Sequence, residues 1–114
     1  KRTPIQVTEA GGGAECLEMM EKERFDMVFL DHMMPEMDGV ETFREIRKRG
    51  LGKDIPIIML TANAMEGERE KYLEEGFDDF LEKPIERSVL ERVLKRNLAP
   101  EKIIEIKLLL SSYS

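Results

Sequence analysis

The sequence predicts an α/β fold built on a parallel sheet, and three observations support this. Short apolar runs that favour strands alternate along the chain with longer segments of helical periodicity. The connections between successive strands are too long for hairpins, which favours parallel strands joined by right-handed crossovers. The runs near 26–31 and 55–61 are apolar on both faces, as expected where helices cover both sides of a parallel sheet.

Length and composition indicate one globular domain with few unusual features. The chain has 114 residues, enough for one hydrophobic core. Its net charge of -6 argues against the basic surface that binds phosphate backbones, so we expect no nucleic-acid partner. No stretch approaches the roughly 20 apolar residues of a membrane span. The single cysteine cannot form an internal disulfide and no signal-peptide pattern is evident, so we expect a cytoplasmic location.

The first half of the chain contains two strand–helix units. Ile5–Ala10 alternates apolar and polar residues, as a short strand does, and ends in three glycines that form a turn. Ala14 to about Glu23 is rich in helix formers, with apolar residues along one side. A second strand is expected near Asp26–Asp31. The amphipathic pattern of Val40–Arg49 predicts a helix that the following glycines bring to an end.

The second half repeats this alternation. Ile55–Thr61 predicts another buried strand, and the composition of Met65–Glu75 predicts a helix that ends at a glycine. Asp79–Glu82 is expected to form a short strand, and Lys83–Pro84 a turn. Glu86–Leu98 carries apolar residues at four-residue spacings, which indicates a helix.

This arrangement predicts that three polar side chains lie at one edge of the sheet. Asp31, Thr61 and Lys83 stand at the carboxyl ends of three consecutive strands, where parallel sheets present their chemistry. A carboxylate can accept a phosphoryl group if fixed partners neutralise the charge on the transferring oxygens. A divalent cation, a lysine and a hydroxyl are such partners. The backbone carbonyl of Met33 is in a position to ligate Mg²⁺.

The motifs at these strand ends resemble the receiver domain of two-component response regulators, particularly the receivers of hybrid histidine kinases. They are DHMMPEMDG after the second strand, IPIIMLTANA at the third, and GFDDFLEKPI at the fourth. Three motifs in the right order and spacing are far more specific than one. The resemblance covers roughly residues 3 to 98 and implies a flavodoxin-like, doubly wound parallel sheet with the strand order 2-1-3-4-5.

The resemblance also implies roles for individual residues. Asp31 would be the phosphoacceptor, with Lys83 as its counter-charge, and Thr61 the hydroxyl that closes on the phosphoryl group. Phe80 matches an aromatic switch position. Asp31 and the Met33 carbonyl would ligate Mg²⁺. A histidine kinase or a histidine phosphotransfer protein would donate the phosphoryl group, so the domain is expected to act at most on itself and not as an enzyme on other substrates. The peptide bond between Lys83 and Pro84 would be cis.

The match also suggests that the domain is incomplete at its N-terminus. Family members begin with a strand that ends in two acidic residues, followed by a helix, and neither pattern is found here. We therefore expect residues 1–98 to be a receiver domain lacking its first strand and helix. The missing strand would lie between Ile5–Ala10 and the strand near Asp26–Asp31, and its acidic pair would be missing from the Mg²⁺ site.

The C-terminal tail, residues 99–114, lies outside the resemblance and is a candidate to pack into the vacated region. The pattern of Lys102–Leu110 predicts a strand with an apolar face or, equally, a helix that has Pro100 and Glu101 in its first turn. As a strand in the vacant position, it would bring Ser111 and Ser112 near the usual place of the acidic pair. A strand or helix exchanged with a second copy of the chain is a third way to fill the position. A homodimer without exchange is a further candidate assembly.

Three hypotheses of function remain open. The first is a phosphoacceptor signalling module in a phosphorelay. The second is a pseudo-receiver that is not phosphorylated and serves as a protein-interaction module, because the acidic metal-binding pair is absent. The third, an aspartate-nucleophile phosphatase of the haloacid-dehalogenase type, ranks last because Met33 stands where a second aspartate is needed. His32 is expected to line the site without a chemical role, since a single histidine is a weak metal signal.

Overall fold

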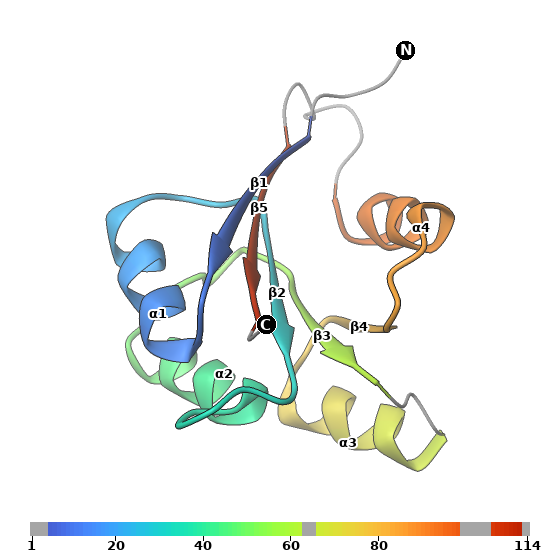
Figure 1. Cartoon of the computed structure of the whole chain (residues 1–114), viewed down its shortest axis with the longest axis horizontal. Helices are drawn as coiled ribbons and strands as arrows, with labels where there is room; N and C mark the ends of the chain where they lie inside the picture. The colour runs from blue at the N-terminus through green and yellow to red at the C-terminus, as the bar shows by residue number, and fades with distance from the viewer. Residues whose placement is uncertain (1–4, 63–65, 99–105, 113–114) are drawn as a thin grey trace.

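The computed structural model describes residues 5–62, 66–98 and 106–112, and within these ranges strands and helices alternate along the chain (Figure 1). The elements, in chain order, are β1 (Ile5–Ala10), α1 (Gly13–Lys22), β2 (Met27–Asp31), α2 (Gly39–Lys48), β3 (Ile57–Thr61), α3 (Glu66–Glu75), β4 (Asp79–Glu82), α4 (Arg87–Asn97) and β5 (Ile106–Ser111). The first eight lie within a few residues of the bounds expected from the sequence.

The described strands form a five-stranded parallel sheet in the order β1-β5-β2-β3-β4. The last strand of the chain therefore lies between the first and the second, as Figure 1 shows by the red ribbon beside the dark blue one. Leu109 at its centre pairs with Thr8 of β1 on one side and Val28 of β2 on the other. If the strands are numbered from β5, the spatial order reads 2-1-3-4-5, the flavodoxin-like arrangement.

The expectation of a receiver domain without its first strand and helix is wrong. The sheet has five parallel strands, with β1 and α1 present, and no position inside it is vacant in the part of the chain that the structure describes. The physical reason is that a parallel sheet is filled by position and not by chain order, so the C-terminal β5 completes it. The expected boundary at residue 98 borders residues 99–105, which lie outside the described residues, as does the start of Lys102–Leu110.

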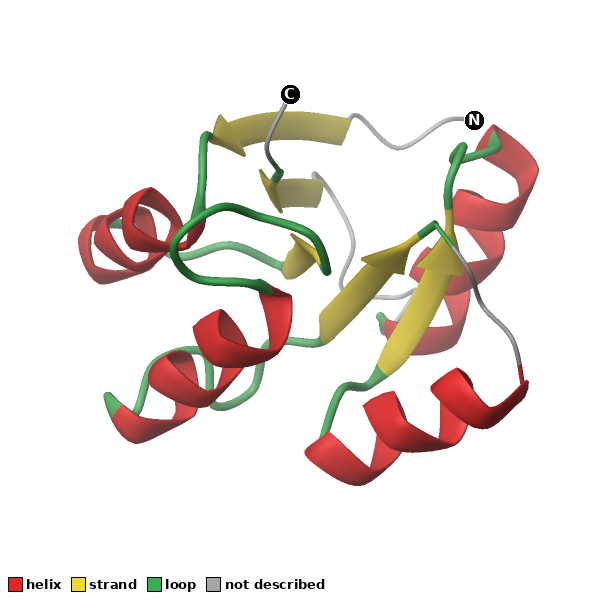
Figure 2. Ribbon diagram, turned by 60° about the horizontal axis from the view of Figure 1, so that its bottom comes forward, coloured by secondary structure: helices red, strands yellow, loops and turns green. Residues whose placement is uncertain are grey.

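Helices cover both faces of the sheet, which makes it doubly wound (Figure 2). On one face, α1, α2 and α3 contribute side chains to a core cluster with β2, β3 and β5; its buried members include Leu17, Met20, Val28, Leu30, Phe43, Ile46, Ile57, Met59, Tyr72 and Leu109. On the other face, α4 packs with Val93 and Leu94 against a second cluster that contains Phe29 and Leu108. Every residue of β2 and β3 is buried, as the apolar runs predicted.

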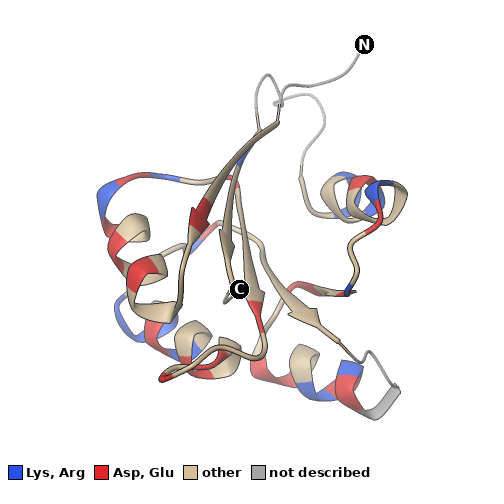
Figure 3. Ribbon diagram, in the orientation of Figure 1, with Lys and Arg blue, Asp and Glu red and all other residues tan. Residues whose placement is uncertain are grey.

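Charged residues lie mainly on the helices and loops, with both signs intermixed (Figure 3). This leaves the strands largely apolar up to their ends. A charged residue inside the sheet is therefore conspicuous, because a buried charge is costly unless it is paired. Asp31, with 3% exposure at the end of β2, is one such residue.

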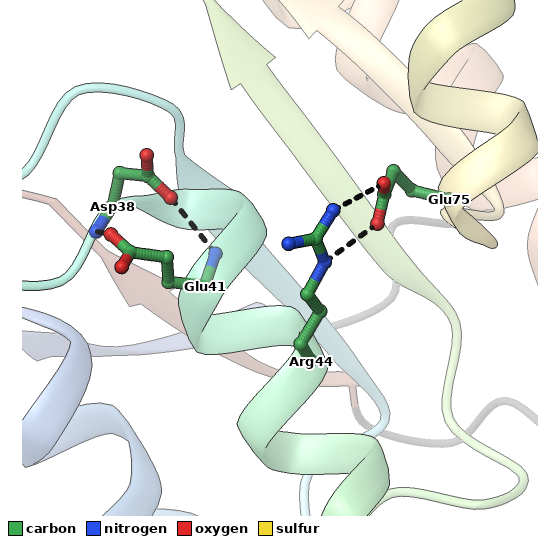
Figure 4. Close-up of polar contacts among 4 residues, drawn as sticks. All are labelled: Asp38, Glu41, Arg44 and Glu75. Carbon is green, nitrogen blue, oxygen red and sulfur yellow. Dashed lines mark hydrogen bonds and ion pairs between the residues drawn. The ribbon is translucent and has the colours of Figure 1, made fainter.

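Several contacts hold the first turns of α2, which begins directly after the loop that follows β2. Asp38 and Glu41 form a capping box, in which the Glu41 backbone N–H donates to Asp38 at 2.8 Å and the Asp38 N–H donates to Glu41 at 3.1 Å (Figure 4). Arg44 donates two hydrogen bonds to Glu75 at the end of α3, at 3.0 and 2.6 Å. A Cβ on Gly39 would lie 2.7 Å from the Asp31 carbonyl oxygen, so only glycine lets α2 approach β2 this closely.

Candidate functional site at the carboxyl edge of the sheet

Neighbouring strands carry the three residues expected at the site to the same edge of the sheet. Asp31 is the last residue of β2, Thr61 is the last of β3, and Lys83 follows β4 directly. The Lys83 backbone N–H donates to the Thr61 carbonyl at 2.8 Å, which extends the β3–β4 ladder just past the strand ends. The sequence prediction that these residues converge is therefore matched by their placement.

Asp31 and Lys83 form the central contact of the site. The Lys83 Nζ lies 2.6 Å from Asp31 Oδ2, although the two residues are 52 positions apart in the sequence. The Asp31 side chain is 4% exposed and that of Lys83 is 40% exposed, so the ammonium reaches a buried carboxylate from the solvent side. The Met33 backbone N–H donates to Asp31 Oδ1 at 3.3 Å. A buried carboxylate with these partners has the charge compensation that burial requires.

The described residues fit a Mg²⁺ ion poorly. Proteins usually hold Mg²⁺ through one or two carboxylates together with water and phosphate oxygens. Here Asp31 supplies one carboxylate, and one of its oxygens already accepts from Lys83. Among the described residues no group of three Asp, Glu, His or Cys side chains comes together to hold a metal. Met33 offers its backbone carbonyl, while its side chain is 73% exposed.

Ser111 ends β5 beside the end of β2, in the region where the sequence placed the serines of the tail. Its backbone is paired with Leu30, one residue before Asp31. The Ser111 hydroxyl is fully buried and donates to the Gly12 carbonyl at 3.0 Å. A hydroxyl used in this way closes the turn after β1, and it contributes no negative charge that would attract a cation.

Thr61 makes a contact that the sequence did not predict. The Tyr72 hydroxyl of α3 donates to Thr61 Oγ1 at 3.3 Å and lies 3.3 Å from Nδ1 of His32. Thr61 and Tyr72 are 4% and 3% exposed. The sequence predicted a helix here but no role for Tyr72. A phenol in this helix was the available signal, because a buried hydroxyl needs a partner.

Phe80 is half-buried on β4 and packs at the margin of the core cluster that α1, α2 and α3 share. The Arg69 guanidinium lies 5.0 Å from the centre of its ring, within cation–π distance. The Lys83–Pro84 peptide bond is cis, as the resemblance implies. Phe80, Lys83 and Pro84 line an open groove together with Val89 of α4.

Comparisons with known proteins agree on one family. The sequence model described as the response regulator receiver domain matches residues 1–95, so the match begins at the first residue of the chain. Response regulator MprA of Mycobacterium tuberculosis is 41% identical over 99 residues, which cover 84% of this chain and 42% of that protein. Sensor histidine kinase GacS of Pseudomonas protegens is 38% identical over 110 residues, covering 88% of this chain and 12% of that protein.

The solved receiver domain of sensor histidine kinase PA1611 from Pseudomonas aeruginosa is similar in structure. It superimposes with a TM-score of 0.69 at 31% identity, covering 85% of this chain and 98% of that one, and it has a magnesium ion coordinated in its active site cleft. This chain spans less than half the length of the two curated relatives. No helix among the described residues is long and apolar enough to cross a membrane.

Proposed function

Because the chain belongs to the response regulator receiver domain family of two-component signalling, we propose that Asp31 accepts a phosphoryl group from a phosphohistidine. The donor would be a histidine kinase or a histidine phosphotransfer protein. A carboxylate oxygen of Asp31 attacks phosphorus; the new P–O bond forms as the P–N bond breaks, and the bonding electrons return to the imidazole nitrogen.

The Asp31–Lys83 ion pair is the observation that supports this proposal most directly. A phosphoryl group on Asp31 adds negative charge at the place where the Lys83 ammonium already lies, 2.6 Å from the carboxylate. Lys83 is 40% exposed, so its flexible side chain has room to follow the charge onto the phosphoryl oxygens.

Thr61 and Phe80 are the proposed switch residues. The Thr61 hydroxyl would move toward the phosphoryl group, and Phe80 would turn inward on β4. Phe80 is half-buried and borders the groove beside α4, so a change in its position alters the surface formed by β4 and α4. This is a population shift between two packings, biased by one added charge.

Mg²⁺ has a smaller part in the proposal than the family resemblance implied. The described residues supply one carboxylate and a backbone carbonyl, so we assign no step to the ion. Phosphorylation is expected to change less than tenfold when Mg²⁺ is replaced by excess EDTA. A complete dependence on Mg²⁺ would show that Asp31 and the Met33 carbonyl hold the ion well enough, and would contradict this expectation.

The test is treatment of the folded chain with a small phosphodonor, followed by intact-mass measurement. We expect a gain of one phosphoryl group that Asp31→Asn abolishes. Asp38→Asn is the matched control: Asp38 lies in the neighbouring loop and asparagine can still cap α2, so this variant is expected to be phosphorylated like the original chain. Transfer from a phosphorylated histidine phosphotransfer protein then tests the natural class of donor.

A pseudo-receiver that is not phosphorylated is the second candidate, and the single carboxylate at the site favours it. In that case the folded chain gains no phosphoryl mass, while a histidine phosphotransfer protein binds it and its Asp31→Asn variant equally well. The cytoplasmic location and the homodimer stay predictions. Exchange of strands is not needed to complete the sheet, since β5 of the same chain lies between β1 and β2.

A further inference from the structure

The Tyr72 hydroxyl lies between the proposed switch residue Thr61 and His32, which follows the proposed phosphoacceptor. We propose that Tyr72 is a positioning residue that holds the Thr61 hydroxyl away from Asp31 through a hydrogen bond made only in the unphosphorylated state. The state dependence rests on the proposed function; the hydrogen bond itself does not. Nothing in the sequence resemblance assigned a role to this tyrosine.

Packing in the core fixes the Tyr72 ring, in addition to its edge-on contact with His32 at 5.7 Å between ring centroids. The side chain is 3% exposed and belongs to the core cluster under α1, α2 and α3. Phe77 meets the ring edge-on at 6.3 Å between centroids, and Phe77 in turn stacks on Phe43 at 4.2 Å. A ring held on this side cannot follow Thr61 if the threonine moves toward Asp31.

The hydroxyl, in contrast, contacts two polar groups of the site among the residues that the structure describes. It lies 3.3 Å from Thr61 Oγ1 and 3.3 Å from His32 Nδ1. A phenol has one proton: Tyr72 donates it to Thr61 while accepting from the imidazole, or donates it to the imidazole while accepting from Thr61. The Thr61–Tyr72 hydrogen bond exists in both arrangements, so the inference does not depend on the histidine tautomer.

The length of this hydrogen bond makes it sensitive to the position of Thr61. At 3.3 Å it already exceeds the usual 2.5–3.0 Å for two hydroxyl oxygens. A further displacement of Thr61 toward a phosphoryl group on Asp31 therefore breaks it. A contact made in one state and lost in the other biases the equilibrium toward the state that has it. Tyr72 thus opposes the switch. The net free energy of one hydrogen bond between uncharged groups corresponds to a change of about 2- to 10-fold in the equilibrium constant between the two states.

The first experiment is a double-mutant cycle on unfolding, which does not require phosphorylation. Tyr72→Phe removes only the hydroxyl, and Thr61→Val removes the hydroxyl it contacts. If the bond exists, the two substitutions are non-additive by about 2- to 10-fold in the unfolding equilibrium constant. The control is Thr42→Val, since the Thr42 hydroxyl is equally buried but donates to the Asp38 carbonyl at 2.7 Å. Additivity of Tyr72→Phe with Thr61→Val overturns the proposal.

The second experiment tests the state dependence by NMR of the Thr61 methyl group and by phosphorylation. In unphosphorylated Tyr72→Phe the methyl resonance should move toward its position in the phosphorylated original chain, and the phosphorylated form should be favoured about 2- to 10-fold more. The gain in the phosphorylated fraction should not occur when Tyr72→Phe is combined with Thr61→Val, because the hydroxyl that Tyr72 contacts is then absent. An unchanged resonance and phosphorylated fraction in Tyr72→Phe overturn the state dependence.

The two experiments separate failure of this inference from failure of the proposed function. If the original chain takes up no phosphoryl group, the proposed function fails and the state dependence fails with it, while the cycle still decides whether Tyr72 holds Thr61. If phosphorylation occurs and Tyr72→Phe behaves like the original chain, only the inference fails.

Discussion

Leu109→Ala tests whether β5 lies at the centre of the sheet. Leu109 is fully buried, pairs with β1 and β2, and packs in the cluster that α1, α2 and α3 cover. Replacing a buried leucine by alanine costs the transfer free energy of the lost methyl groups plus the cost of the cavity, about 3–5 kcal/mol. That is a large part of the roughly 5–15 kcal/mol by which such domains are stable.

The control is Leu110→Ala, the same substitution one residue later in the same strand. Leu110 is half-buried and points to the opposite face, where it borders the cluster under α4. Its truncation should cost only about 1–2 kcal/mol. Lys107 of the same strand is unchanged in both variants, and in the original chain its backbone N–H donates to Asp26 at 2.7 Å.

Urea and thermal unfolding followed by circular dichroism measure both costs. For a domain of this size, 3–5 kcal/mol corresponds to a fall in Tm of roughly 10–20 °C, and the control should fall by about a third of that. A loss below about 1 kcal/mol for Leu109→Ala, or equal losses for the two variants, would refute the central position of β5 and the complete sheet that follows from it.

Three further predictions concern separate parts of the molecule. Burial raises the pKa of the Cys16 thiol to about 11, so a thiol reagent at pH 8 should label Cys16 only as the chain unfolds; rapid labelling of the native protein would contradict this. Asp38→Ala should lower the free energy of unfolding by about 1 kcal/mol through loss of the α2 cap, whereas Asp38→Asn should retain most of it, both measured by urea unfolding. Arg44 lowers the pKa of Glu75, so the pair stabilises the fold at neutral pH and this contribution is lost as the pH falls below 4.5; the stability difference between the original chain and Glu75→Gln should therefore close in acid, and a constant difference would count against the ion pair.

The positions of strands and helices could be predicted from local patterns, because the burial of each element determines which of its residues are apolar. The apolar runs of β2 and β3 are fully buried, and the amphipathic residues of α2 do pack on the sheet with Phe43 and Ile46. The edge of the sheet that carries the candidate site could be predicted in the same way. Once parallel strands are inferred, Asp31, Thr61 and Lys83 must stand at the same edge, whichever neighbours the strands have.

The position of β5 was left open by the sequence. Its apolar run suits a strand or a helix, and a strand in the vacant position was one of the alternatives. Pairing between parallel strands joins residues far apart, as when Met27 of β2 pairs with Leu108 of β5. No local pattern encodes such a pairing, so the sequence could not choose between a tail strand that completes the sheet and a tail helix that leaves it incomplete.

The sequence by itself determined the α/β class, the elements up to α4 and the carboxylate, hydroxyl and lysine that meet at one edge of the sheet. Only the tertiary structure decided that β5 fills the centre of the sheet and that the Tyr72 hydroxyl meets Thr61 and His32. The physical reason is the same in both cases. Periodicity reports which side of an element is buried, whereas the partner of a buried strand or hydroxyl is chosen by packing between elements that are distant in the chain.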